Sequence, residues 1–154
     1  MQRTRNVKHS GWFSLLSFCV VISALKPAVA ASFAGLEPGR SFRWEADREF
    51  GPVAVELIPG VRYRYERTGG AIAYVDVISD RESGVIDYID IYPSCDLYQE
   101  QARKILELTG GPDRKYGLGG QLVEIYGAEG VSLYYDGTGN NSRIRFISCS
   151  AAAR

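Results

Sequence analysis

The hydrophobic and polar residues after position 40 alternate with the period of a helix in two stretches and with the period of a strand in six. Helical spacing predicts a short helix over 41–50 that ends at Gly51-Pro52, and a second helix that begins at Ser94 or Asp96 and runs to about Thr109. The apolar stripes that define them consist of Phe42, Ala46 and Phe50 in the first helix and Tyr98, Ala102, Ile105 and Leu106 in the second.

Three strands are predicted after each helix, because apolar and polar residues alternate there one by one. Their ranges are 61–66, 71–77 and 85–92 in the first half and 122–126, 131–136 and 143–149 in the second. The pattern leaves open whether Val53 to Pro59 forms an additional strand. The glycine-rich segment 117–120 precedes a strand and not a helix, so we interpret it as a hairpin or loop.

The chain also matches itself at an offset of 60 residues. Gly51-Pro52 falls on Gly111-Pro112, and Ala73-Tyr74-Val75-Asp76 falls on Leu133-Tyr134-Tyr135-Asp136. We interpret this match as duplication of one supersecondary unit, with repeats at about 37–93 and 94–150. The alternative is chance similarity between two amphipathic stretches.

Two tandem units, each a helix plus three antiparallel strands, predict an α+β fold class. The linker between the repeats is short, so we expect one domain over 31–154 with its helices on one face of the sheet. The other face is then left to solvent or to a partner.

The first thirty residues have the parts of a secretory signal peptide. A basic stretch precedes a mainly apolar run of 14 residues from Trp12 to Leu25, and small residues follow Pro27. The run would make a helix of roughly 21 Å, too short for a hydrocarbon core of about 30 Å. We therefore expect a periplasmic or secreted protein with no lipid anchor and no membrane span after cleavage. The small residues allow cleavage before Ala31 or before Ser32, and the first is preferred.

Export determines how the cysteines are interpreted, because Cys19 leaves with the signal peptide and only Cys95 and Cys149 remain. Thiols in an oxidising compartment usually pair. A disulfide between Cys95 and Cys149 is therefore expected, against the alternative of two free buried thiols.

Composition argues against several kinds of chemistry. Residues 31–154 carry 14 basic and 18 acidic side chains, a balance of −4 that argues against a nucleic acid partner. The one histidine, His9, lies in the signal peptide, so the mature chain lacks the imidazole used by serine and cysteine hydrolases and by histidine-ligated zinc sites. No phosphate-binding loop motif is present. We therefore predict no catalytic residues, no metal site and no cofactor, and do not expect an enzyme.

Acidic residues crowd the stretch from Asp76 to Asp90. Paired carboxylates can hydrolyse glycosides or bind calcium, but the spacing matches no calcium-loop motif. A solvated turn beside Arg81 is the preferred interpretation.

The tyrosines and arginines of the strands suggest a contact surface, because both residue types are enriched at the hot spots of protein interfaces. Alternation puts one group of them on the outer side of the strands. The candidate protein-binding face consists of Arg62, Arg64, Tyr74, Tyr126 and Tyr134. Ordinary cross-strand packing on an exposed sheet is the alternative.

Phe50-Gly51-Pro52 with 63–76, and Gly111-Pro112-Asp113 with 123–136, resemble the SmpA/OmlA (BamE-like) family of outer-membrane assembly lipoproteins. In tandem, the two segments resemble the fold of the β-lactamase inhibitory proteins. The resemblance implies binding to another protein without catalysis. Lipoproteins of that family have a lipidated cysteine after the signal peptide, which this chain lacks, so attachment to the outer membrane is not implied.

The expected function is an exported, non-catalytic protein-binding module of the bacterial envelope, with a protein partner of unknown identity. One alternative is a secreted inhibitor of a hydrolase such as a β-lactamase or peptidase, in which a hairpin such as Asp80 to Gly84 enters the cleft of the target. The second alternative is a glycosidase that uses two acids of the 76–90 stretch.

Overall fold

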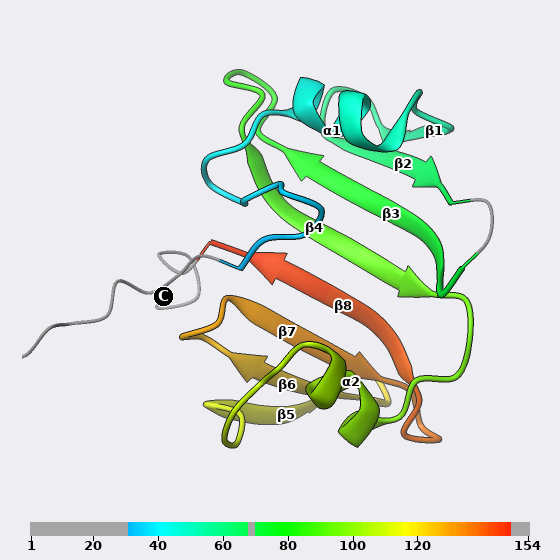
Figure 1. Cartoon of the computed structure of the whole chain (residues 1–154), viewed down its shortest axis with the longest axis vertical. Coiled ribbons are helices and arrows are strands. Elements are labelled where there is room, and N and C mark those ends of the chain that lie inside the picture. The colour runs from blue at the N-terminus through cyan, green and yellow to red at the C-terminus, as the bar shows by residue number, and fades with distance from the viewer. Residues whose placement is uncertain (1–30, 68–69, 149–154) are drawn as a thin grey trace, which may run out of the picture.

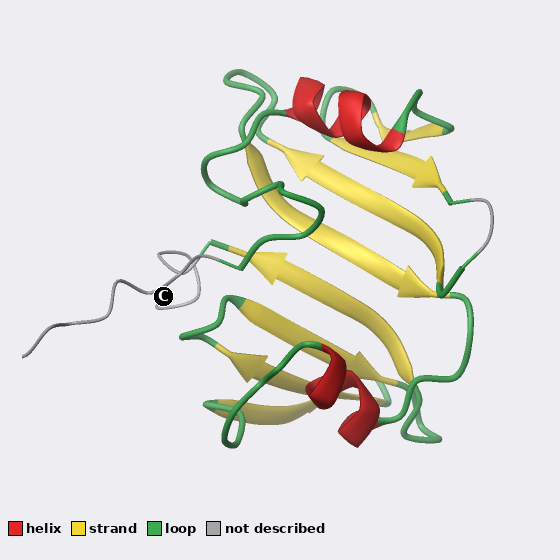
Figure 2. Ribbon diagram, in the orientation of Figure 1, coloured by secondary structure: helices red, strands yellow, loops and turns green. Residues whose placement is uncertain are grey.

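The computed structural model describes residues 31–67 and 70–148, and its main feature is one antiparallel sheet of eight strands (Figure 1). Both helices lie on the same side of the sheet (Figure 2). The elements are α1 Arg43–Phe50, β1 Val55–Ile58, β2 Arg62–Glu66, β3 Ile72–Ser79, β4 Ile86–Pro93, α2 Gln99–Ile105, β5 Arg114–Leu118, β6 Gln121–Tyr126, β7 Val131–Tyr135 and β8 Asn141–Ile147. The strands lie side by side in the order β1-β2-β3-β4-β8-β7-β6-β5.

The expected fold class, α+β built from two helix-plus-three-strand units, is wrong. The chain is predominantly β, its helices have only 8 and 7 residues, and four strands follow each helix. The strands that the pattern left open or missed are β1 and β5, which form the two edges of the sheet with every residue exposed. A strand that buries neither face needs no apolar alternation, so hydrophobic periodicity could not reveal it.

The two helices begin with the same kind of contact; α1 ends at Phe50 as predicted, whereas α2, Gln99–Ile105, is shorter than predicted at both ends. In α1, Glu45 Oε2 accepts the backbone N–H of Phe42 at 2.7 Å, and in α2 Gln101 Oε1 accepts that of Tyr98 at 3.0 Å. These contacts satisfy backbone donors that a helix start leaves unpaired. The second helix stops four residues before Thr109, because Glu107 adopts a left-handed φ of 53°.

The two halves meet at β4 and β8. Ile89 is paired with Phe146 and Ile91 with Ile144, and Asp90 lies opposite Arg145 between these pairs. A half-turn that exchanges β4 with β8 places the pair Ile89–Phe146 on the pair Ile91–Ile144. The strands are therefore related by an approximate two-fold axis that passes through the Asp90–Arg145 pair.

Strand pairing relates the two halves in a register that differs from the offset of 60. Tyr65 of β2 is paired with Val75 of β3, and Tyr126 of β6 is paired with Val131 of β7, at equivalent places beside the central strands. Tyr65 therefore corresponds to Tyr126, an offset of 126 − 65 = 61 and not 60. Because a shift of one residue moves every side chain of a strand to the other face, β6 turns Glu124 and Tyr126 toward the helices.

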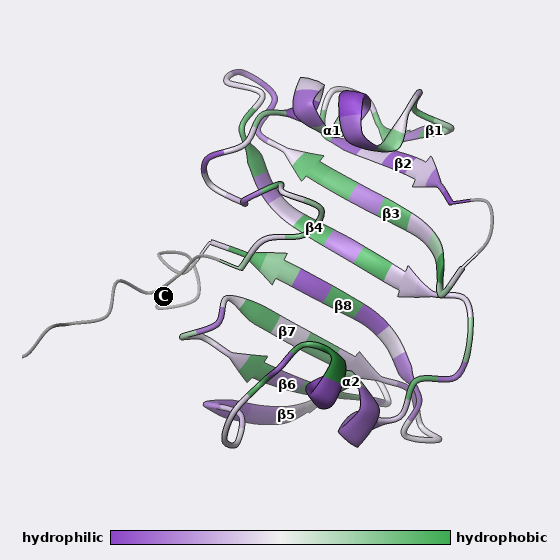
Figure 3. Cartoon of the chain, in the orientation of Figure 1, coloured by the Kyte–Doolittle hydropathy of each residue, from purple (hydrophilic) through white to green (hydrophobic). Residues whose placement is uncertain are grey.

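The core lies between the helices and the sheet. Figure 3 shows alternating hydrophobic and hydrophilic bands along β3, β4 and β8. The apolar row that includes Val75, Ile89 and Ile144 belongs to the core together with Ala46 of α1 and Ala102 of α2. The segment 31–41 crosses the same side, where the Phe33 ring centroid lies 5.9 Å from that of Phe50 and 5.8 Å from that of Phe146. This segment thus joins the two halves, and the opposite side of the sheet stays uncovered by the described elements.

The predictions for the termini fall partly outside the described residues. The signal peptide over 1–30 and Cys149 both lie there, so export and the disulfide stay predictions, and Cys95 is exposed. Ile147, at the end of β8, is paired with Tyr88, whereas β4 continues five residues further to Pro93, about 16 Å along the strand. A bridge within one chain would have to close that separation.

No helix in 31–67 or 70–148 has the length and apolar character to span a bilayer.

Candidate protein-binding face

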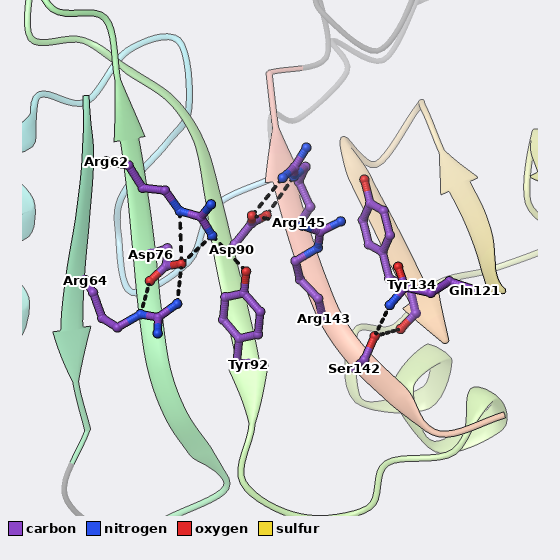
Figure 4. Close-up of polar contacts among 10 residues, drawn as sticks. All are labelled: Arg62, Arg64, Asp76, Asp90, Tyr92, Gln121, Tyr134, Ser142, Arg143 and Arg145. Carbon is purple, nitrogen blue, oxygen red and sulfur yellow. Dashed lines mark hydrogen bonds and ion pairs between the residues drawn. The ribbon is translucent and has the colours of Figure 1, made fainter. Parts of the chain in front are cut away.

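The side of the sheet away from the helices, here called the open face, carries a cluster of charged and aromatic side chains around its central strands (Figure 4). Strand register places on this face Arg62 and Arg64 from β2, Tyr74 and Asp76 from β3, Tyr88, Asp90 and Tyr92 from β4, Tyr134 from β7, and Arg143 and Arg145 from β8. The residues that alternate with them along the strands, such as Val75, Val77 and Ile89, point to the helix side and are fully buried there.

Two buried carboxylates lie at the centre of this cluster. Asp76 and Asp90 are directly opposite each other on β3 and β4, and neither is exposed. Like charges in such a position repel each other, and burial removes the water that would screen them. Arg62 and Arg64 balance Asp76: Arg62 Nη2 donates to its Oδ2 at 2.6 Å, and Arg64 Nε donates to its Oδ1 at 2.7 Å.

Asp90 is balanced from the other side, by β8. Arg145 makes a bidentate pair with it, in which Nε and Nη2 each donate to a carboxylate oxygen at 2.7 Å, and Arg143 Nη1 lies 3.6 Å from Oδ2. Four guanidinium groups against two carboxylates leave two net positive charges. The four arginine side chains are 23% to 29% exposed, so solvent meets the positive charge and not the negative charge.

Tyrosine rings support three of these arginines. The distances from guanidinium carbon to ring centroid are 3.7 Å for Arg64 on Tyr74, 3.8 Å for Arg143 on Tyr134 and 4.0 Å for Arg145 on Tyr88. Tyr74 is stacked on Tyr92 with 4.3 Å between centroids, and the Tyr92 hydroxyl accepts a hydrogen bond from Arg62 Nη2 at 3.0 Å. Cation–π contacts of this kind hold the guanidinium planes against the rings.

The surroundings of this cluster raise the pKa of Tyr92 and of Arg145. Burial raises the pKa of Tyr92, and the nearby Asp90 and Asp76 raise it further, so its phenol stays neutral. Burial alone would lower the pKa of Arg145, but its hydrogen bonds and attraction to Asp90 outweigh burial and raise it above its ordinary value.

Four of the five residues predicted for the binding face lie on it: Arg62, Arg64, Tyr74 and Tyr134. The placement of Tyr126 was wrong. Tyr126 is 1% exposed on the helix side, where its hydroxyl donates to Glu124 Oε2 at 3.3 Å. The offset of 60 had matched it to Glu66, which points outward, whereas strand pairing matches it to Tyr65, which points inward.

Sequence reasoning also missed part of the cluster. It did not select Arg143 and Arg145, although their spacing of two residues repeats that of Arg62 and Arg64 and was the available signal. The preferred solvated turn is correct for Asp80, whose Oδ1 accepts the backbone N–H of Ser83 at 2.7 Å, but wrong for Asp76 and Asp90.

The buried acids limit what this face can do chemically. Because Asp76 and Asp90 are shielded from solvent and bound by arginine, these two carboxylates are not an accessible acid pair for a sugar. Across residues 31–67 and 70–148, no three histidine, cysteine or acidic side chains come together in a way that could hold a metal ion.

No family model matches the chain, and no curated protein matches it in sequence. The resemblance to the SmpA/OmlA family therefore rests on the short motifs alone. Among solved structures, the chain is similar to the crystal structure of a DUF4309 family protein (YjgB) from Bacillus subtilis, with a TM-score of 0.58 and 12% sequence identity. The match covers 74% of this chain and 82% of that one, and at this identity it shows a shared fold alone.

Proposed function

We propose that this chain is an exported, non-catalytic protein-binding module of the bacterial envelope, and that its open face binds an acidic surface of a protein partner. The observation that supports the proposal is the set of four partly exposed arginines around Asp76 and Asp90. The open face has a net positive charge although residues 31–154 have a balance of −4, so the face differs in sign from the rest of the chain.

The energetics of the cluster favour a role in recognition. Buried ion pairs often stabilise a fold less than well-packed apolar residues of the same volume would. Here the network lies on a side of the sheet that no element of the described chain covers. Arginine and tyrosine there would supply contact area, directional hydrogen bonds and positive charge to an interface.

The test compares capture of envelope proteins by the immobilised protein and by two variants. Arg143→Gln removes the arginine most loosely tied to Asp90, and the double variant Tyr74→Ser, Tyr134→Ser removes two rings. Tyr98→Ser is the matched control, because Tyr98 is 52% exposed at the start of α2, on the other side of the sheet.

We expect a protein that is retained by the wild type and the control, lost by both variants and released by raised salt. Thermal unfolding of each variant establishes that it is folded. Equal recovery of the same proteins by the wild type and the folded variants would overturn the proposal.

A further inference from the structure

An apolar cavity of about 250 Å³ lies on the helix side of the sheet, opposite the proposed binding face. Its wall includes Phe33 from the segment 31–41, Ile72 from β3, Ile91 from β4, Ile144 from β8, and Leu97 and Ile105 beside and within α2. The two helices lie over the outer parts of their own halves, toward opposite ends of the sheet (Figure 2). The central strands are thus covered mainly by the segment 31–41, and the cavity lies where this cover is incomplete.

The cavity wall has no charged or amide side chain, and its one polar side chain is the thiol of Cys95. A water molecule would find almost none of the two to four hydrogen-bond partners that it needs, so the site favours an apolar occupant. An apolar cavity of about 150 Å³ in another protein holds one benzene molecule, so the present volume corresponds to about ten carbon atoms.

A hollow that adjoins the cavity, here called its mouth, carries one lysine and one aspartate. It shares Leu97 and Ile105 with the cavity and is also lined by Asp96, Gln101 and Lys104. Asp96 accepts a hydrogen bond from Asn140 Nδ2 at 3.0 Å. Within 31–67 and 70–148, Lys104 makes no ion pair, so its ammonium is available to an anionic group at the mouth.

We propose that this cavity binds a medium-chain fatty acid anion, with its alkyl chain in the cavity and its carboxylate beside Lys104. The apolar wall and limited volume of the cavity select the alkyl chain of the ligand, and Lys104 selects its carboxylate. This inference does not depend on the proposed protein-binding function, because it concerns the opposite side of the sheet and a different ligand.

Calorimetric titration of the purified protein with hexanoate, octanoate, decanoate and dodecanoate tests the fit of the chain. Affinity should rise by about fourfold for each added methylene that enters the cavity. It should stop rising near decanoate, when the cavity is full. The absence of saturable decanoate binding to the folded protein, or an affinity that rises without a plateau, would overturn the proposal.

Two variants at the cavity test whether the alkyl chain of the ligand binds there. Ala71 lines the cavity and is exposed, so Ala71→Trp fills it without disturbing the core and should weaken decanoate binding by at least about tenfold. Ala54→Trp, also exposed but outside the cavity, is the control and should bind as the wild type does. Ile105→Glu, at a position 67% exposed, is a second way to block the site. Unchanged binding by folded Ala71→Trp and Ile105→Glu would contradict the location.

The head group is tested with Lys104→Gln and with decanol, which has the same chain and no charge. Lys104→Gln should weaken decanoate binding by about fivefold and leave decanol binding unchanged. Arg114→Gln, an exposed change on β5, should alter neither. If Lys104→Gln weakens the binding of decanoate and decanol equally, or weakens the binding of neither, Lys104 does not bind the carboxylate.

Discussion

Asp76 and Asp90 face each other across β3 and β4 without solvent contact, and each is bound by arginines from a different neighbouring strand. The charges that balance them come from β2 on one side and from β8 on the other. Since β4 and β8 are also the strands at which the two halves meet, the Asp90–Arg145 pair joins one half of the chain to the other.

Asp90→Asn should lower the free energy of unfolding by about 2 kcal/mol, because it leaves two guanidinium groups without their anion. Removing one partner of a fully buried pair costs about 3–5 kcal/mol, and the partial exposure of these arginines reduces the effect. Urea unfolding followed by circular dichroism measures the change. Glu82→Gln, an exposed change in the turn between β3 and β4, should unfold like the wild type, and a wild-type midpoint for Asp90→Asn would contradict the expectation.

Two glycines in the segment 31–41 provide a matched pair for testing how this segment docks. Gly35 and Gly39 have φ values of 78° and 83°, so alanine is strained at either position by about 1 kcal/mol. A Cβ atom at Gly35 meets nothing within 4 Å, whereas one at Gly39 lies 3.0 Å from Cβ of Ser148.

Gly39→Ala should therefore be less stable than Gly35→Ala by about 1 kcal/mol, because a steric clash adds to the backbone strain. Differential scanning calorimetry of both variants gives the difference directly. Equal melting temperatures would mean that the segment does not pack against the end of β8 in solution.

The inner strands could be predicted from the sequence because each buries one face, and their apolar rows follow from that burial. The edge strands β1 and β5 could not, since all their residues are exposed. The direction of Tyr126 required the pairing of β6 with β7, which a self-match of the sequence fixes only to within a residue. The burial of Asp90 depends on Arg145, 55 residues away, and no local pattern shows such a contact.

Tyr65 should make stability fall at alkaline pH. Burial in the core raises its pKa well above the ordinary 10.0, and a hydrogen bond donated to Asp47 Oδ1 at 2.7 Å raises it further. The folded state therefore holds the proton more tightly than the unfolded state. The corresponding stabilisation is complete below pH 10 and is lost as the pH rises through the folded pKa.

Ultraviolet absorbance titration should show this phenol ionising only as the protein unfolds. Tyr65→Phe should make stability fall less steeply above pH 10, whereas Tyr98→Phe, at an exposed position, should leave the slope unchanged. Identical slopes for the wild type and Tyr65→Phe would rule out the predicted contribution.

Glu124 should have the opposite effect, at acidic pH. Its carboxylate is buried beneath α2, where Arg103 Nη2 donates to it at 2.7 Å, Lys115 Nζ lies 3.3 Å away and the side-chain amide of Gln99 also donates to it. Burial alone would raise the pKa of Glu124, but the contacts with Arg103 and Lys115 outweigh burial and lower it below the ordinary 4.5. The folded state therefore favours the ionised form.

The stabilisation from Glu124 is complete above pH 4.5 and is lost as the pH falls through the lower, folded pKa. Glu124→Gln should thus be less stable than the wild type by about 2 kcal/mol at neutral pH, because it leaves Arg103 beneath the helix without its anion. The difference should shrink as the pH falls below 4.5, where the wild-type carboxylate also becomes neutral.

Urea unfolding at a series of pH values gives both curves, with Glu82→Gln as the control whose curve should follow the wild type. Parallel curves for the wild type and Glu124→Gln down to the acid transition would show that the buried carboxylate does not titrate with folding.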